Sequence, residues 1–368
     1  MPDTGSPTEH PILNVAVFGA GAFGQNHVRV YRELQNAGLP VALAAVVEPD
    51  PARAAALQAQ YGVPVFAHVE ECLAAPGLRI DAASVCVPTS LHFAVASALL
   101  RAGIDVLVEK PIAATLEEAD ALVELAATRH RILQVGHLER FNPAITAVEP
   151  HLNCPMFFEV HRLSVFTPRA LDVDVVLDLM IHDLDIVLSF ARSTVREVRA
   201  VGLPILSPRV DIANVRLEFE SGAVANFTAS RVSTERVRKL RFFQPRQYVS
   251  IDYARKDLLV INVDKTNPGS GANLGTNPGA SPGTNPSPAP DFSLPIPSLA
   301  AGLSFKKPAI APGEPLRLEI ESFLAAVRER SRPRVSAEDG RAALALALEI
   351  NRAIAAHLDR TGLNRFHL

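Results

Sequence analysis

The stretch Gly19-Ala20-Gly21-Ala22-Phe23-Gly24 decides how the first part of this chain folds. It follows the apolar run Ile12–Phe18, which predicts a strand, and it leads directly into a helical pattern. In such a strand–turn–helix unit Gly19 forms the tight turn and Gly21 lets a phosphate approach the backbone, while Gly24 lets helix and strand pack closely. The N–H groups at the start of the helix then attract the anion. The stretch therefore predicts a dinucleotide-binding loop that includes Ala22 and Phe23.

A second apolar run, Val41–Val47, ends in Glu48, which lies 24 residues beyond Gly24. In dinucleotide-binding folds an acidic residue about 20 residues after the glycines accepts hydrogen bonds from the adenosine ribose. Its charge would repel the 2′-phosphate of NADP. Glu48 therefore predicts NAD as the cofactor, the alternative being a structural turn followed by a surface glutamate.

The first third of the chain alternates short apolar runs with helical segments rich in alanine and leucine. Near-continuous apolar strands separated by helices are typical of a parallel sheet covered on both faces. We expect an N-terminal Rossmann domain with a doubly wound parallel sheet over residues 12–143, after a disordered stretch over residues 1–11. The expected strands are Asn14–Phe18, Leu43–Val47, Ala83–Val87, Asp105–Val108 and Ile132–Val135, and the expected helices are Gln25–Gln35, Ala52–Tyr61, Leu91–Ala102 and Leu116–Thr128.

The pattern changes after Pro143, where strand-like runs follow one another without helices between them. This clustering indicates an open, mainly antiparallel sheet in an α+β substrate-binding domain over residues 144–368. An open sheet face usually needs covering, so we expect a homo-oligomer, either a dimer or a tetramer. The expected helices are Asp174–Ala191, Pro315–Arg328 and Ala337–Asp359, and the expected strands are Phe157–Phe166, Val198–Leu203, Asn214–Glu220, Ala223–Ser230, Lys239–Phe243, Tyr248–Asp252 and Leu258–Val263.

Residues 264–313 differ in composition from the rest of the chain. The segment Thr266–Pro290 is nearly all Gly, Asn, Pro, Ser, Thr and Ala. Such a segment cannot bury enough apolar area to offset the entropy lost on ordering. We predict a disordered insertion in a loop of the second domain, with a docking segment for a partner as the alternative.

Composition and charge exclude several classes of protein. A net charge of −3 argues against nucleic acid as a partner, because that would require a concentrated basic surface. The three cysteines contain no C-x-x-C pair, so they indicate neither a disulfide framework nor a zinc site. Residues 1–10 lack the basic and apolar regions of a signal peptide, and the apolar stretch Ala342–Ala356 is too short and too charged to span a bilayer. We therefore expect a cytoplasmic protein without a membrane partner.

The motif Glu109-Lys110-Pro111 stands at the end of a predicted strand, at the edge where doubly wound sheets bind ligands. A lysine that is partly desolvated beside a cationic nicotinamide would have its pKa lowered into a range useful for proton transfer. The alternative is a solvated Lys110 that pairs with Glu109.

The predicted helix after residue 174 carries Asp178-Leu-Met-Ile-His182-Asp183-Leu-Asp185. Asp178 and His182 are four residues apart and share one helix face, and Asp185 lies nearly on that face. An imidazole oriented by a carboxylate one turn away suits a general acid or base. The alternatives are a surface ion pair and a metal pair. Because no further His or Cys cluster accompanies these residues, we predict no metal.

Together these motifs resemble the Gfo/Idh/MocA family of nicotinamide-dependent sugar oxidoreductases. The resemblance covers nearly the whole chain outside residues 264–313, and it depends on the glycine loop, on Val87-Pro88-Thr89-x-x-His92, on Glu109-Lys110-Pro111 and on the helix with His182. It implies that Lys110 and His182 flank the reacting carbinol. It also implies that Pro88, Thr89, His92, Glu109 and Pro111 lie at the cofactor. The family's central glycine of D-x-G-x-H is here Met180, so the substrate of inositol or glucose members cannot be transferred.

Within the family, Arg140-Phe141-Asn142-Pro143 and Ala229-Ser230-Arg231-Val232-Ser233 look most like the nucleotide-sugar branch that begins 2,3-diamino-sugar synthesis for lipid A. This likeness implies NAD-dependent oxidation of the 3-hydroxyl of a nucleotide-linked sugar such as UDP-N-acetylglucosamine. The implied substrate-binding residues are Arg140, Asn142, Asp185, Arg231 and Arg236.

A cluster of basic residues between Arg231 and Arg246 also favours a substrate that carries phosphate. Arginine suits bidentate contact with a phosphate, although a solvated basic strand edge is an equal alternative. Two other functions stay open, namely a dehydrogenase of a free sugar or cyclitol and a non-catalytic NAD-binding scaffold. The cluster, which falls within 16 residues, consists of Arg231, Arg236, Arg238, Lys239, Arg241 and Arg246.

Overall fold

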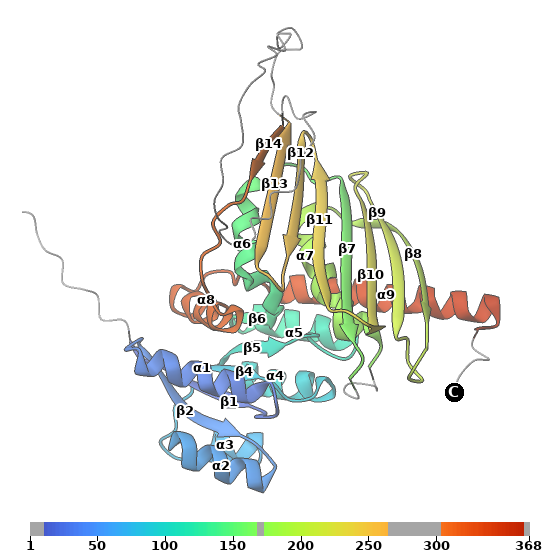
Figure 1. The fold of residues 1–368 in the computed structure, drawn as a ribbon. Coiled ribbons are helices and arrows are strands. Elements are labelled where there is room, and N and C mark those ends of the chain that lie inside the picture. Colours follow the sequence, from blue (N-terminus) through green and yellow to red (C-terminus); the bar gives the residue numbers. More distant parts are fainter. Residues whose placement is uncertain (1–10, 168–172, 264–302, 364–368) are drawn as a thin grey trace, which may run out of the picture.

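The computed structural model describes residues 11–167, 173–263 and 303–363, which form two sheets with helices packed between and beside them (Figure 1). Residues 1–10 and 264–302, which hold most of the expected disordered segments, lie outside the described residues.

The first sheet has six parallel strands in the order β3-β2-β1-β4-β5-β6. This is the order of a Rossmann fold, so the predicted fold class is confirmed. The direction of winding reverses between β1 and β4, and ligands bind outside the carboxyl ends of the strands at such a point. The strands are β1 Leu13–Phe18, β2 Val41–Val47, β3 Val65–Phe66, β4 Ala82–Val85, β5 Asp105–Glu109 and β6 Leu133–Gly136.

Helices cover both faces of this sheet. Helix α8, Pro315–Glu329, comes from the far end of the chain and buries Ile320 and Phe323 in the same core as β1 and α1. The division of the chain at residue 143 stays a prediction. The other covering helices are α1 Gly24–Asn36, α2 Pro51–Tyr61, α3 Val69–Ala74, α4 His92–Arg101 and α5 Leu116–Thr128.

The second sheet has eight strands in the order β14-β13-β12-β11-β7-β10-β9-β8, and every neighbouring pair is antiparallel except β7 with β10. The prediction of a mainly antiparallel sheet is confirmed. The strands are β7 Phe157–Val165, β8 Val195–Leu203, β9 Ile212–Phe219, β10 Val224–Ser233, β11 Val237–Gln244, β12 Gln247–Asp252, β13 Asp257–Val263 and β14 Leu303–Lys306.

Strand β14 corrects the expected extent of the disordered insertion. Leu303 and Phe305 pair with Val263 and Ile261 on β13. Residues 303–306, which lie within the range predicted as an insertion, therefore belong to the second sheet.

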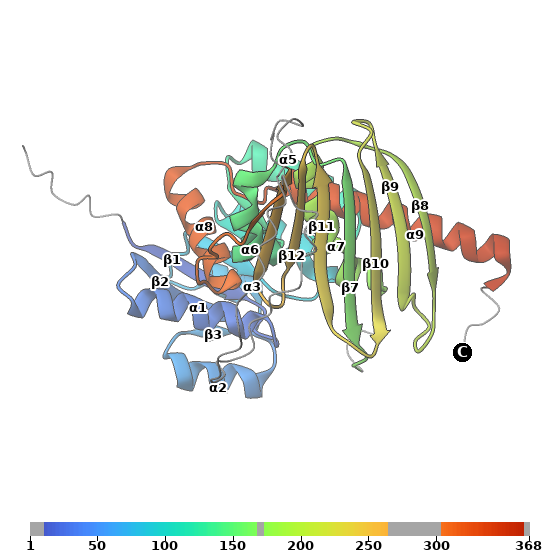
Figure 2. The same cartoon turned by 45° about the horizontal axis from the view of Figure 1, so that its top comes forward.

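One face of the second sheet carries helices α6 (Pro143–Val148), α7 (Ile181–Ala191) and α9 (Ala337–Thr361), whereas the described residues place no helix on the other face (Figures 1 and 2). Helix α9 also reaches the first sheet, because a Cβ on Gly340 would lie 2.5 Å from a methyl carbon of Val135. This close approach ties the two sheets together. Of the helices that the structure describes, none is long and apolar enough to cross a membrane.

The helix expected over Asp174–Ala191 begins with a π-helical turn over Val176–Met180 and becomes regular only at Ile181. The N–H of Ile181 bonds to the carbonyl of Val176, five residues back. Wide turns of this kind occur frequently at functional sites, and the site described next contains this one.

Candidate active site

The three glycines of the N-terminal loop each meet a different steric demand. Gly19 has a φ of +86°, and a Cβ there would lie 2.8 Å from the backbone nitrogen of Val87. A Cβ on Gly24 would lie 2.0 Å from the carbonyl oxygen of Gly19. Around Gly21 no described atom lies within 4 Å of that position, so its backbone is open to an approaching group. The loop therefore fits the pyrophosphate of a dinucleotide.

Glu48, which directly follows β2, holds this loop through a hydrogen bond. Its carboxylate is almost fully buried and accepts hydrogen bonds from the backbone N–H of Ala20 at 3.1 Å and from the Arg53 guanidinium at 3.0 Å. Burial opposes ionisation, but the hydrogen bonds from Arg53, Asp50 and Ala20 outweigh it and hold the pKa of Glu48 below its usual value. Glu48 is therefore ionised and stands at the place where the adenosine ribose of a dinucleotide would bind.

His92 connects the loops that follow β4 and β5. Its Nδ1 lies 2.8 Å from the carbonyl oxygen of Pro111, and its Nε2 lies 2.9 Å from that of Val87. The ring is buried, and this burial lowers its pKa. His92 thus fixes the two loops, and its place at the cofactor stays a prediction. Thr89 and Pro111 line an open cavity of about 450 Å³.

Glu109 is held from beneath by His27, a residue that the sequence argument missed. His27 Nε2 lies 3.1 Å from the Glu109 carboxylate, and His27 Nδ1 lies 3.1 Å from the hydroxyl of Ser84. His27 stands three residues after Gly24 on α1, so its spacing from the glycine loop was the available signal. The contact fixes the start of the Glu109-Lys110-Pro111 turn.

Lys110 reaches from the first sheet to the π-helical turn of the second domain. Its Nζ donates to the backbone oxygens of Asp178 at 2.8 Å and Leu177 at 3.3 Å. Lys110 and Asp178 line the cavity of about 450 Å³ together with Thr89. Asp178 contacts Lys110 through its main chain, and within the described chain its carboxylate makes no hydrogen bond with His182. That this carboxylate orients His182 stays a prediction.

His137, which is buried, and His182, which is half-buried, lie beside each other at this place. Their ring centroids are 6.3 Å apart and the planes are nearly perpendicular. Among the described residues, His182 Nδ1 and both ring nitrogens of His137 have no hydrogen-bond partner. Buried polar groups rarely stay unpaired in folded proteins except where a function requires it.

Both imidazoles are neutral at pH 7. Burial is the main cause that lowers the pKa of His182 well below 6.5, and the charges of Lys110 and Arg162 add to it. Burial and the charges of Arg140 and Lys110 lower the pKa of His137 to about 3. The sequence analysis gave His137 no role. The pairing of Glu109 with Gly136 in the parallel sheet puts Lys110 and His137 at adjacent strand ends.

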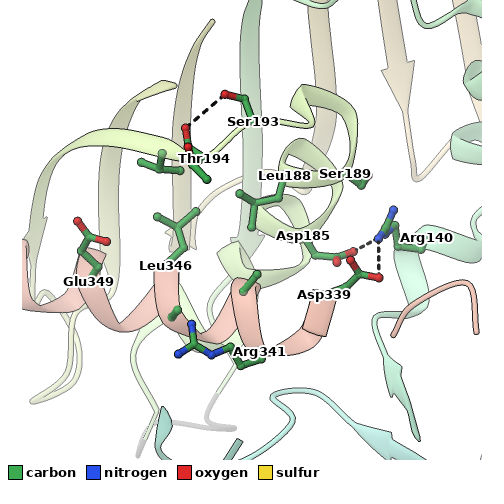
Figure 3. A pocket seen from close by; sticks show the side chains of 13 residues that line it. Arg140, Asp185, Leu188, Ser189, Ser193, Thr194, Asp339, Arg341, Leu346 and Glu349 are labelled. Carbon is green, nitrogen blue, oxygen red and sulfur yellow. Dashed lines mark hydrogen bonds and ion pairs between the residues drawn. The ribbon is translucent and has the colours of Figure 1, made fainter. Parts of the chain in front are cut away.

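Arg140 and Asp185, both predicted to bind substrate, bind each other. Arg140 Nε lies 2.8 Å from an Asp185 carboxylate oxygen, and Asp339 of α9 stands 3.8 Å from the same guanidinium (Figure 3). These residues line a separate cavity of about 380 Å³ between α7 and α9. Asn142 caps α6 by accepting from the N–H of Ala144. The structure thus assigns all three predicted residues to internal contacts.

Arg231, another predicted substrate ligand, makes internal contacts that support a loop. Its buried guanidinium donates to the Asp211 carboxylate at 2.7 Å and to the backbone oxygen of Val173 at 2.7 Å. Arg236 is exposed in the turn between β10 and β11. A buried pair that the sequence argument missed joins Arg162 to Asp183 through two bonds of 2.6 and 2.9 Å.

Comparisons with family models, with curated proteins and with solved structures all find members of one family. Residues 13–137 match the Gfo/Idh/MocA model described as "Oxidoreductase family, NAD-binding Rossmann fold", and residues 145–246 match a C-terminal domain of the same family. The chain is 34% identical over 95% of its length to UDP-N-acetylglucosamine 3-dehydrogenase of Acidithiobacillus ferrooxidans, covering 99% of that protein. A solved structure of that protein aligns with a TM-score of 0.79, 32% identity and coverage of 94% of this chain and 99% of that one. The scyllo-inositol 2-dehydrogenase (NAD(+)) of Bacillus subtilis is 28% identical over 61% of this chain and 69% of its own.

Proposed function

This chain belongs to the Gfo/Idh/MocA family of oxidoreductases and carries its NAD-binding Rossmann domain, and from that premise we propose that it oxidises the 3-hydroxyl group of UDP-N-acetylglucosamine. The products would be the 3-keto nucleotide sugar and NADH. The proposal is supported by the likeness to UDP-N-acetylglucosamine 3-dehydrogenase over nearly the whole chain.

The observation that carries the proposal is the meeting of Lys110 and His182 from two different domains. Lys110 is tied to the turn that precedes His182, and its charge helps to keep the imidazole neutral. A neutral imidazole can accept the proton of a hydroxyl group, and an ammonium can donate a hydrogen bond to the alkoxide that develops.

The proposed step assigns one task to each group. NAD, when bound, would supply the acceptor for the hydride that leaves C3. His182 takes the proton of the C3 hydroxyl, while Lys110 stabilises the developing negative charge on that oxygen. The C–H and O–H bonds break and the C=O bond forms, so charge and electrons balance. A general base of this kind contributes about 10²–10⁴-fold to the rate.

The test is the pair Lys110→Met and His182→Asn, assayed by NADH formation with UDP-N-acetylglucosamine. We expect turnover to fall about 10²–10⁴-fold in each variant while NAD affinity changes little. Lys239→Met and His161→Asn, on strands β11 and β7 of the second sheet, are the matched controls and should keep parental turnover. Near-parental turnover of both site variants would show that these residues do not perform the proton transfer.

The helix-free face of the second sheet supports a further part of the proposal, that a second copy of the chain covers it. Phe157, Phe243 and Tyr248 form an aromatic cluster on strands of this sheet, with ring centroids 5.7 and 5.0 Å apart, and Phe243 is 41% exposed. Exposed apolar patches of this kind mark interaction sites. Light scattering after size exclusion should give a multiple of the 39.5 kDa chain mass, and Phe243→Glu should lower it. A monomeric parent at micromolar concentration would contradict this part.

We also place the reaction in the cytoplasm, at the start of 2,3-diamino-sugar synthesis for lipid A. A 3-keto sugar is the compound that an aminotransferase requires to introduce nitrogen at C3. Genes for an aminotransferase and an acyltransferase beside this one would support the placement, and a neighbourhood devoted to cyclitol breakdown would argue against it.

A further inference from the structure

Strand β11 divides the basic cluster between the two faces of the second sheet. Leu240 and Phe242 are buried toward α7, where the ring of Phe242 lies 5.9 Å from that of Phe190. Side chains alternate along a strand, so Arg238 lies on the same face as Leu240, whereas Lys239 and Arg241 lie on the opposite face. Only one cation of this strand therefore faces the helix of His182.

The carboxylates around Arg238 are already used by another arginine. Arg238 stands directly opposite Arg162 on β7. The Arg162 guanidinium binds both oxygens of Asp183 and one oxygen of Glu139. The Arg238 side chain is exposed and makes no hydrogen bond or ion pair with any residue of the described chain. Partial desolvation and the nearby charge of Arg162 lower its pKa. No carboxylate of the described chain therefore pairs with the positive charge of Arg238.

The position of this cation relates it to the reacting centre. The charge of Arg238 acts on His182 and contributes to the lowered pKa of that imidazole. Arg236 in the preceding turn adds a second positive charge that acts on Arg238. Two neighbouring arginines repel each other unless an anion joins them, and a phosphate oxygen pair matches the planar guanidinium fork.

We propose that Arg238, assisted by Arg236, binds the diphosphate of the nucleotide sugar and so selects nucleotide-linked sugars over free ones. This inference rests on the proposed function, since it names the residues that bind the diphosphate of that substrate. The diphosphate lies across the sugar ring from the C3 hydroxyl. It also gives a binding partner to an exposed arginine that makes no hydrogen bond within the described chain, whereas Arg162 on the neighbouring strand is buried and paired.

The test separates binding from turnover by titrating UDP into the protein calorimetrically. Arg238→Ala should weaken UDP binding by roughly ten- to hundredfold, which is the usual range for a hydrogen bond to a charged group. Arg241→Ala, on the same strand but the opposite face, is the matched control and should bind UDP like the parent. Arg238→Lys should recover part of the affinity, since it keeps the charge but not the fork. Thermal unfolding of each variant establishes that it is folded.

With UDP-N-acetylglucosamine, Arg238→Ala should raise KM strongly and change kcat little. Parental UDP affinity in a folded Arg238→Ala variant would overturn the inference, as would a parent that oxidises UDP-N-acetylglucosamine without binding UDP. A parent that binds UDP through Arg238 but does not oxidise UDP-N-acetylglucosamine would instead contradict the proposed function and support the diphosphate site.

Discussion

The Nζ atom of Lys110 lies 2.8 Å from the backbone carbonyl oxygen of Asp178, so the two domains meet at the reacting centre through a main-chain contact. The π-helical turn over Val176–Met180 presents this oxygen immediately before His182. The distance between the lysine and the imidazole is thereby fixed by backbone geometry and does not depend on a carboxylate.

The first prediction concerns the Asp178 side chain. Asp178→Asn keeps the carbonyl that Lys110 contacts, so kcat should fall less than about tenfold, whereas His182→Asn should cost about 10²–10⁴-fold. Steady-state rates with saturating substrate and NAD measure both. Equal losses in the two variants would mean that the Asp178 carboxylate orients His182 after all.

The glycine loop gives a prediction with its own internal control. Gly24→Ala places a Cβ 2.0 Å from a backbone oxygen that cannot move aside, so this variant should unfold at a clearly lower temperature and lose NAD binding. At Gly21 the same position meets no described atom within 4 Å, so Gly21→Ala should unfold near the parental temperature and bind NAD more weakly. Thermal unfolding and fluorescence titration with NAD distinguish the two. The steric assignment is wrong if the variants behave alike.

Cofactor preference should depend on Glu48 and its partner Arg53. The parent should bind NAD more tightly than NADP, because the ionised Glu48 carboxylate would face the 2′-phosphate. Glu48→Gln removes that charge and releases Arg53 from its 3.0 Å ion pair, so the ratio of NADP to NAD affinity should rise by at least about tenfold, or 1.4 kcal/mol. Adding Arg53→Ala should cancel the gain. A ratio that does not change in Glu48→Gln would remove Glu48 from the ribose site.

Glu319 on α8 should make stability fall with rising pH. Its side chain is fully buried, neither carboxylate oxygen has a hydrogen-bond partner among the described residues, and burial followed by the charge of Glu109 raises its pKa well above 4.5. The folded protein therefore keeps a proton that the unfolded chain releases above pH 4.5, and the stability present below that pH is lost as the pH rises toward the folded pKa.

Glu319→Gln mimics the protonated acid, so it should raise the unfolding temperature at about pH 8.5 and have little effect near pH 4.5. Glu321→Gln, which removes a partly exposed partner of Arg317 on the same helix, is the control and should not flatten the pH dependence. Identical pH dependences of the parent and Glu319→Gln would show that Glu319 is not protonated in the fold.

Local patterns were sufficient to predict the motifs, because each depends on neighbours in the sequence. The turn at Gly19–Gly24 and the position of Lys110 at a strand end follow from composition and spacing alone. Strand β3 was missed because two residues carry no periodicity. The π-helical turn was missed because its apolar spacing does not differ from that of an ordinary helix.

The sequence did not reveal side-chain contacts whose partner lies far along the chain. Arg140 pairs with Asp185, 45 residues away, and Arg231 pairs with Asp211, 20 residues away. The sequence around each arginine does not show this partner. In the sequence alone, each arginine therefore looks like a residue available to bind phosphate. The basic cluster likewise looked like one continuous surface in the sequence. In the structure the alternation of side chains along β11 places Arg238 and Arg241 on opposite faces of the second sheet.

Helix α8 has a consequence for how the protein is made. Its residues Ile320 and Phe323 complete the core around β1 and α1, yet they are synthesised more than 180 residues after Gly136, the last residue of the first sheet. Domains usually fold as units during synthesis. Here the nascent dinucleotide-binding half exposes an uncovered apolar face until the C-terminal segment arrives. A chain that terminates before α8 should therefore form a defective cofactor site, although the missing segment lies at the opposite end of the gene. The nascent N-terminal half should also depend on chaperones.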